Sequence, residues 1–125
     1  EQLKFFEGIN DCLRTNKPDV FLASSSLQYI EDPYELIKNT IDLGFKYIIL
    51  DRTTFLKDAD RITVQRVRPG IYNASYPARF IDEERLLGMI TNKYRVAAEF
   101  DSLMGNHVDL GNAVAFEKGF IFIRR

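Results

Sequence analysis

The sequence has few of the residues that mark several common classes of protein. It contains one cysteine, Cys12, so an internal disulfide cannot form and nothing indicates an oxidising compartment. It contains one histidine, His107, and so lacks the cysteine and histidine spacing of a zinc site. Apolar runs stay well short of the roughly 20 residues of a membrane span, and the first residues lack a signal-peptide core. We therefore expect a cytoplasmic protein without a membrane partner or a bound metal.

The chain also has little net charge. The chain has 17 Lys and Arg residues against 18 Asp and Glu residues, for a formal net charge of −1. No overall field would attract nucleic acid, so a nucleic-acid partner is not expected. With 125 residues, of which 46% are hydrophobic, the chain is long enough for one buried core. We therefore expect residues 1–125 to form a single domain.

The first part of the chain alternates between strand and helix patterns. Short apolar runs predict strands at 3–6, 19–23 and 46–50, with a helix at 8–16 between the first two. The runs at 19–23 and 46–50 have no polar alternation, which is typical of buried parallel strands.

The clearest boundary in the sequence starts a second helix. Asp32 is a good N-cap, Pro33 suits the first helical position and Glu35 completes a capping box. Gly44 is a natural residue to follow the helix. Because this helix lies between two predicted strands with short connections, it predicts a right-handed parallel crossover.

The second part of the chain begins with a long insertion at 52–80. It contains an alternating segment at 61–67 and an aromatic loop. Asp82 is placed to begin a helix that runs to about Asn92. The final strands are predicted at the following ranges: 94–101 and 120–124, with a turn at 117–119.

Two polar segments follow predicted strands and are candidates for a ligand site. The first is Ser24–Tyr29, after strand 19–23, and the second is Asp51–Thr54, after strand 46–50. Open α/β sheets bind ligands beyond the carboxyl ends of their strands, where both segments would lie. The alternative is structural, with the serines capping strand and helix ends and Asp51 paired with Arg52 or Arg79.

At these segments the chain resembles a known family. The relevant stretches are Ser25–Tyr29, Asp32-Pro33, Ile49–Thr53, Val64-Gln65 and Ile71–Pro77. The order of these stretches and their residues are similar to those of S-adenosylmethionine-dependent methyltransferases from bacterial surface-polysaccharide gene neighbourhoods. The resemblance covers nearly the whole chain.

The resemblance implies an α/β fold with a Rossmann-like methyltransferase sheet of strand order 3-2-1-4-5-7-6, flanked by helices. Residues 3–6 would match the third strand, 19–23 the fourth and 46–50 the fifth, with the last two strands as the sixth and seventh. The sheet would be mostly parallel, with the last strand antiparallel.

The chain departs from this family where the cofactor is held. The family binds S-adenosylmethionine with a glycine-rich turn after the first strand and an acidic residue after the second. Here the seven glycines are never closer than six residues, so no such turn can form. We therefore expect a truncated, C-terminal half that does not bind the cofactor alone, with the first two strands upstream of Glu1.

The insertion at 52–80 is the best clue to the substrate. Its six basic residues outnumber Asp58 and Asp60 by 6 − 2 = 4 charges. A basic lid with tyrosines would suit a small acceptor that is anionic or linked to a sugar, because guanidinium groups bind carboxylate and phosphate bidentately. The alternative is an ordinary solvated loop.

The resemblance implies a role for each candidate residue in the complete protein, which would transfer a methyl group to an oxygen or nitrogen atom. Asp51, at the carboxyl end of strand 46–50, would be the catalytic base or a hydrogen-bond partner of the acceptor. The remaining roles would be cofactor binding by Ser25, Leu27 and Gln28 and acceptor binding by Arg52, Gln65, Tyr72 and Tyr76.

An alternative function is a non-catalytic α/β interaction module. Truncation would also leave strand 19–23 at an open edge, which recruits partners. We expect Leu3–Phe6 to pair beside it within a homodimer.

Overall fold

The computed structural model describes residues 2–57, 59–103, 105 and 107–125. Within these residues it has three α-helices, one 3₁₀ turn (η1) and seven strands. Asp58, one of the two acidic residues counted in the insertion, lies outside them. The elements are α1 Ile9–Thr15, β1 Val20–Ser24, η1 Leu27–Tyr29, α2 Pro33–Leu43, β2 Tyr47–Leu56, β3 Arg61–Arg66, β4 Ser75–Asp82, α3 Glu83–Ile90, β5 Tyr94–Asp101, β6 His107–Asp109 and β7 Val114–Arg124.

The predicted crossover β1–α2–β2 is confirmed. The Asp32 side chain accepts a hydrogen bond of 2.9 Å from the Glu35 backbone N–H, and Pro33 is the first helical residue. Gly44 ends the helix with a φ of 74°, a conformation that costs glycine little. Strands β1 and β2 pair in parallel over five residues, from Val20 with Tyr47 to Ser24 with Asp51.

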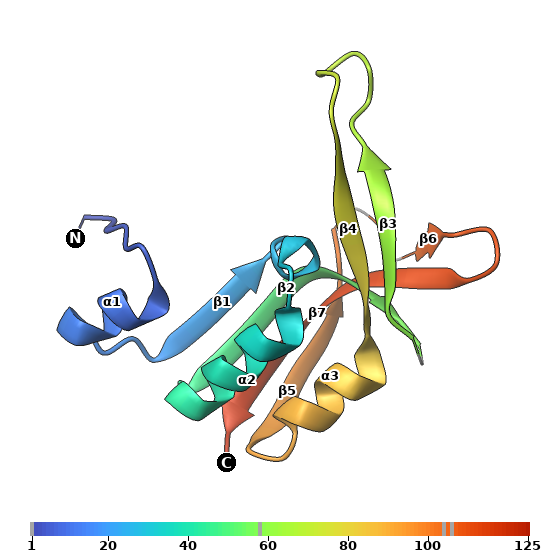
Figure 1. The fold of residues 1–125 in the computed structure, drawn as a ribbon. Helices are drawn as coiled ribbons and strands as arrows, with labels where there is room; N and C mark the ends of the chain where they lie inside the picture. The colour runs from blue at the N-terminus through green and yellow to red at the C-terminus, as the bar shows by residue number, and fades with distance from the viewer. Residues whose placement is uncertain (1, 58, 104, 106) are drawn as a thin grey trace.

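The sheet is mixed rather than mostly parallel. Its body has the order β1–β2–β7–β5, in which β7 is antiparallel to both neighbours and the other three strands share one direction. Strand β6 also pairs antiparallel with β7. Strands β3 and β4 form an antiparallel hairpin that joins the body through a short parallel contact between β4 and the end of β2. In Figure 1 this hairpin projects away from the rest of the molecule.

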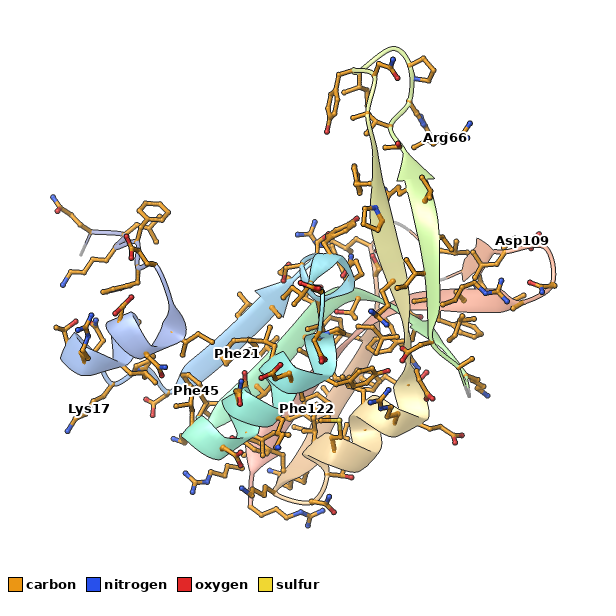
Figure 2. The ribbon with its side chains drawn as sticks, viewed as in Figure 1. Lys17, Phe21, Phe45, Arg66, Asp109 and Phe122 are labelled. Carbon is orange, nitrogen blue, oxygen red and sulfur yellow. The ribbon has the colours of Figure 1, made fainter. Side chains whose placement is uncertain are left out.

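The main core lies between the sheet and two helices. Helices α2 and α3 lie side by side over one face of the sheet (Figure 1). Because side chains alternate across a strand, Ile48 and Leu50 of β2 and Phe120 and Phe122 of β7 all point toward these helices and are buried. In Figure 2, Phe122 accordingly lies between α2 and α3 in this view.

A smaller core lies at the base of the hairpin, where Leu56, Phe80 and Ala115 pack together. The loop before β3 is anchored by Asp60, which accepts hydrogen bonds of 2.7 Å from the Tyr34 hydroxyl and 3.0 Å from the Asp82 backbone N–H. The Arg85 guanidinium lies 3.7 Å from the centre of the Tyr34 ring. Helices α2 and α3 therefore hold the hairpin base to the body.

Three predictions about strands are wrong. Residues 3–6 form no strand and do not pair beside β1; the side chains of Leu3 and Phe5 are 83% and 88% exposed. Strand β2 continues past Leu50 to Leu56, and 117–119 belongs to β7 rather than to a turn. For β2 and β7, long-range pairing between these two strands set their length, and local pattern does not report such pairing. The helices near 8–16 and 82–92 and the strand at 94–101 are confirmed.

Candidate functional site

The candidate site begins at a kink where β1 ends and β2 continues. The pairing of β2 with β7 shifts register between Leu50 and Thr53, and Arg52 has a φ of 48°. Across from it Ser25 has a φ of 49°, and its N–H donates to the Asp51 carbonyl at 2.9 Å. Non-glycine residues in this left-handed region cost about 1–2 kcal/mol each. Such strain concentrates at functional sites, so these two kinked residues mark a candidate site.

Asp51, Arg52 and Ser24 form a polar cluster at this kink. The Ser24 hydroxyl donates to the Asp51 carboxylate at 2.6 Å, and the Arg52 guanidinium donates to the Ser24 oxygen at 3.0 Å. Arg52 Nε is 3.4 Å from Asp51 Oδ2, so the predicted structural pair of these two residues is confirmed. The Asp51 side chain remains 33% exposed. A carboxylate has about four acceptor positions, so Asp51 keeps capacity to accept a hydrogen bond from a ligand.

Gln28 connects the kink to a cleft. Its side chain is 4% exposed, and its Nε2 donates to the Arg52 carbonyl at 3.1 Å. Among the described residues, its Oε1 has no hydrogen-bond partner. Gln28 also lines a cleft of about 550 Å³, together with Ser25 and Gln65. This volume is within the range of small-molecule sites.

Tyrosines form an aromatic corner beside the cleft. Tyr29, Tyr72, Tyr76 and Pro77 line a pocket of about 420 Å³. The rings of Tyr29 and Tyr76 meet edge to face with centroids 5.5 Å apart, and the Tyr29 hydroxyl donates to Gln65 Oε1 at 3.1 Å. Tyr29 lines both spaces, so the cleft and the aromatic corner adjoin.

The structure brings most of the predicted site residues together, in two groups. Ser25, Gln28 and Gln65 line the cleft, and Tyr72 and Tyr76 line the aromatic corner. The pair formed by Asp51 and Arg52 lies behind them, joined to the cleft through the hydrogen bonds of Ser25 and Gln28. Leu27 is different, because its side chain is fully buried in the main core.

The arginines of the insertion do not gather in the cleft. Arg61 donates to Asn112 at 2.8 Å, and Arg66 lies toward the far end of the hairpin (Figure 2). Arg79 donates to the Glu31 carbonyl at 3.2 Å and lines a smaller pocket of about 240 Å³ beside Gln28. Among the described residues, no arginine lines the cleft or the aromatic corner. The charge of this segment therefore gives no support to an anionic ligand there.

Several lining residues were not predicted as site residues, among them the polar residues Tyr29, Glu117 and Thr54. Tyr29 ends the stretch Ser25–Tyr29, which carries part of the sequence resemblance, so its place in the site could have been predicted from that stretch. Glu117 was assigned to a turn, and only the full length of β7 brings it to the cleft. Thr54 was not expected to remain in a strand, because the end of β2 was placed too early.

Comparison with known proteins gives no relative. The chain matches no protein-family model, no curated protein and no solved structure. Within the described part of the chain, no helix is long and apolar enough to cross a membrane. In the same residues, no group of three or more His, Cys, Asp or Glu side chains is placed to hold a metal ion.

Proposed function

We propose that this chain is the acceptor-side part of an S-adenosylmethionine-dependent methyltransferase with a Rossmann-like sheet. The complete protein would transfer a methyl group to an oxygen or nitrogen atom of a small acceptor. The observation that carries the proposal is the strand arrangement β1–β2–β7–β5, with β7 alone reversed among these four. It supports the proposal because it has the order and directions of strands 4-5-7-6 that the sequence resemblance implies.

The uncovered face of the sheet also supports this proposal. Val20 and Leu22 of β1 lie on this face and are 43% and 59% exposed. Doubly wound sheets carry helices on both faces, whereas here α2 and α3 cover one. A further layer over the second face would bury these side chains.

The residues of this chain do not by themselves fit the cofactor. Its glycines are too widely spaced for the turn against which the methionine part would lie. The contribution that we assign to this chain is therefore on the acceptor side. Asp51 would accept the proton or a hydrogen bond from the acceptor, Gln28 would orient the acceptor and the tyrosines would exclude water.

The test has two parts. This chain alone should give no heat of binding with S-adenosylmethionine in calorimetry, whereas the same chain with its natural upstream sequence should bind it. That upstream sequence should contain a strand, a glycine-rich turn and a helix, with an acidic residue about 20 positions later. Micromolar binding to this chain alone would contradict the assignment to the acceptor side.

In the complete protein, Asp51→Asn should lower turnover by about 10²–10⁴-fold, as expected for loss of a general base. The matched control is Asp42→Asn. It changes an exposed carboxylate on α2 that is paired with Lys93, which lies in the loop before β5. Near-normal turnover of Asp51→Asn would remove Asp51 from the chemistry. Failure of that variant to fold would support a structural role for Asp51. Ser24→Ala, which changes another residue of the same cluster, would then test that role independently.

One observation favours the alternative of a non-catalytic interaction module. The exposed apolar side chains of β1 would equally suit a bound partner protein. The upstream sequence separates the two functions: absence of the glycine-rich turn and its acidic residue would favour the module.

A further inference from the structure

The unpartnered oxygen of Gln28 is the strongest sign of a ligand in the cleft. Its orientation is set by the neighbouring backbone, because a flipped amide would place Oε1 against the Arg52 carbonyl, acceptor against acceptor. Leaving a buried amide oxygen without a donor costs about 1–3 kcal/mol. The side chain is 4% exposed and lines the cleft, so an O–H or N–H group bound there would supply the missing donor. A ligand that carries such a group therefore suits the site.

Three other polar groups of the cleft also present acceptors. The Thr54 hydroxyl donates a hydrogen bond to the Arg79 carbonyl at 2.9 Å, and the Thr63 hydroxyl donates one to the Ala78 carbonyl at 3.2 Å. Their oxygens keep lone pairs for a ligand. The Glu117 carboxylate is an acceptor and receives a hydrogen bond from Ser102. A ligand with several hydroxyl donors matches this set better than a phosphate or carboxylate, which only accepts.

The charges around the cleft balance. Glu117 is the charged residue among those that line it, and Arg79 lines the adjoining pocket with Gln28 and Tyr29. The Arg79 Nε is buried and, among the described residues, has no hydrogen-bond partner. The Glu117 carboxylate in the cleft opposes an anionic ligand and the Arg79 guanidinium in the adjoining pocket opposes a cationic one, so together they favour a ligand without net charge.

The aromatic corner provides an apolar surface next to these acceptors. Tyr29 and Tyr76 present ring surface, and Pro77 extends it. Such a surface packs against the C–H face of a saturated ring. We infer that the cleft and aromatic corner together bind an uncharged, polyhydroxylated ring, the chemistry of a neutral sugar unit. Only the description of this sugar as a methyl acceptor rests on the proposed function; the binding site itself does not.

The inference is tested by binding alone, without cofactor or turnover. The side-chain amide signals of Gln28 and Gln65 in ¹⁵N–¹H NMR spectra report directly on the cleft. Titration with methyl glucoside should shift both signals and saturate in the millimolar range. Glucuronate, in which a carboxylate replaces the C6 hydroxymethyl group of glucose, should bind at least about tenfold more weakly because it meets Glu117. Tighter binding of glucuronate, or of inorganic phosphate, would overturn the inference.

Matched variants localise the site. Tyr29→Ala and Gln28→Met should each weaken methyl glucoside binding by about tenfold. The controls Phe5→Ala and Gln2→Met, at exposed N-terminal positions, should leave it unchanged. If Gln28→Met fails to fold, Gln65→Met replaces it, because Gln65 lines the same cleft from the projecting hairpin. Unchanged binding in Tyr29→Ala, or a response to an ammonium salt and not to the glucoside, would overturn the inference.

Discussion

The two faces of the sheet have similar apolar side chains in alternating positions, but only one face is covered. On β7, Phe120 and Phe122 point toward the helices and are 1% and 0% exposed. The residue between them, Ile121, points to the other face and is only partly buried, in the same row as Ile49 and Leu22. Leu22 is 59% exposed. Local strand pattern is therefore alike on both faces, and the helices alone decide which residues form the core.

The largest difference between the faces should appear in matched deletions on β7. Phe122→Ala should lower the free energy of unfolding by about 3–5 kcal/mol, because it leaves a cavity beneath α2. Ile121→Ala, one residue away on the open face, should cost about 1 kcal/mol. Urea denaturation measures both. Equal losses would mean that the open face is covered in solution, for example by a second copy of the chain.

The covered face also has a polar member, Lys118, which should give the next largest effect. Its ammonium lies 2.7 Å from Glu83 of α3 and 2.6 Å from Glu99 of β5, and its side chain is 14% exposed. Lys118→Met should cost about 2–3 kcal/mol, between the values for exposed and buried ion pairs, because it leaves Glu83 without its partner. Arg95→Met, at an exposed position of β5, is the control and should change little.

The same ion pair predicts a pH dependence. Burial lowers the pKa of Lys118, but the hydrogen bonds and charges of Glu83 and Glu99 outweigh it, and the net pKa is raised. The stabilisation is therefore fully present below the ordinary lysine pKa of 10.5 and is lost as pH rises through the higher folded-state value. The difference in Tm between wild type and Lys118→Met should shrink above that pH. A difference that grows with alkaline pH would contradict this assignment.

A smaller effect should mark a tight contact at Gly119 on the open face. A Cβ at Gly119 would lie 2.7 Å from the Leu50 carbonyl oxygen and 2.3 Å from the Phe100 ring. The ring can move but the paired backbone cannot, so Gly119→Ala should cost about 1–2 kcal/mol. Gly88→Ala, on α3 with open space around it, should be neutral or stabilising. Thermal denaturation of both variants decides whether Gly119 is required for packing.

The smallest change in stability is expected at the β1 edge. Leu22→Lys should alter the free energy of unfolding by no more than about 0.5 kcal/mol, because Leu22 is already exposed. Lysine on an edge strand opposes strand pairing between molecules. If the chain forms a homodimer through β1, sedimentation should show that this variant shifts it to the monomer. A dimer that persists in the variant would place the contact elsewhere.

Local signals located the capped elements well. The N-caps Asp32 and Asp82 each accept a hydrogen bond from a backbone N–H three residues on, as their side-chain chemistry predicts. The same signals brought Ser25, Gln28 and Gln65 into consideration. They could not show that Leu27, beside Ser25 and Gln28 in the chain, turns into the core, because a 3₁₀ turn places successive side chains on different sides.

What the sequence by itself determined is the set of short-range elements: caps, helix faces and apolar strand segments, all of which depend on residues a few positions apart. Only the tertiary structure decided where β2 ends, that β7 reaches back to Val114 and that the hairpin projects beside η1. These outcomes depend on backbone pairing between segments 61 to 76 residues apart, from Phe55 with Phe116 to Tyr47 with Ile123, and such pairing leaves little trace in local composition. The cleft exists only because that pairing brings Gln28, Gln65 and Glu117 together.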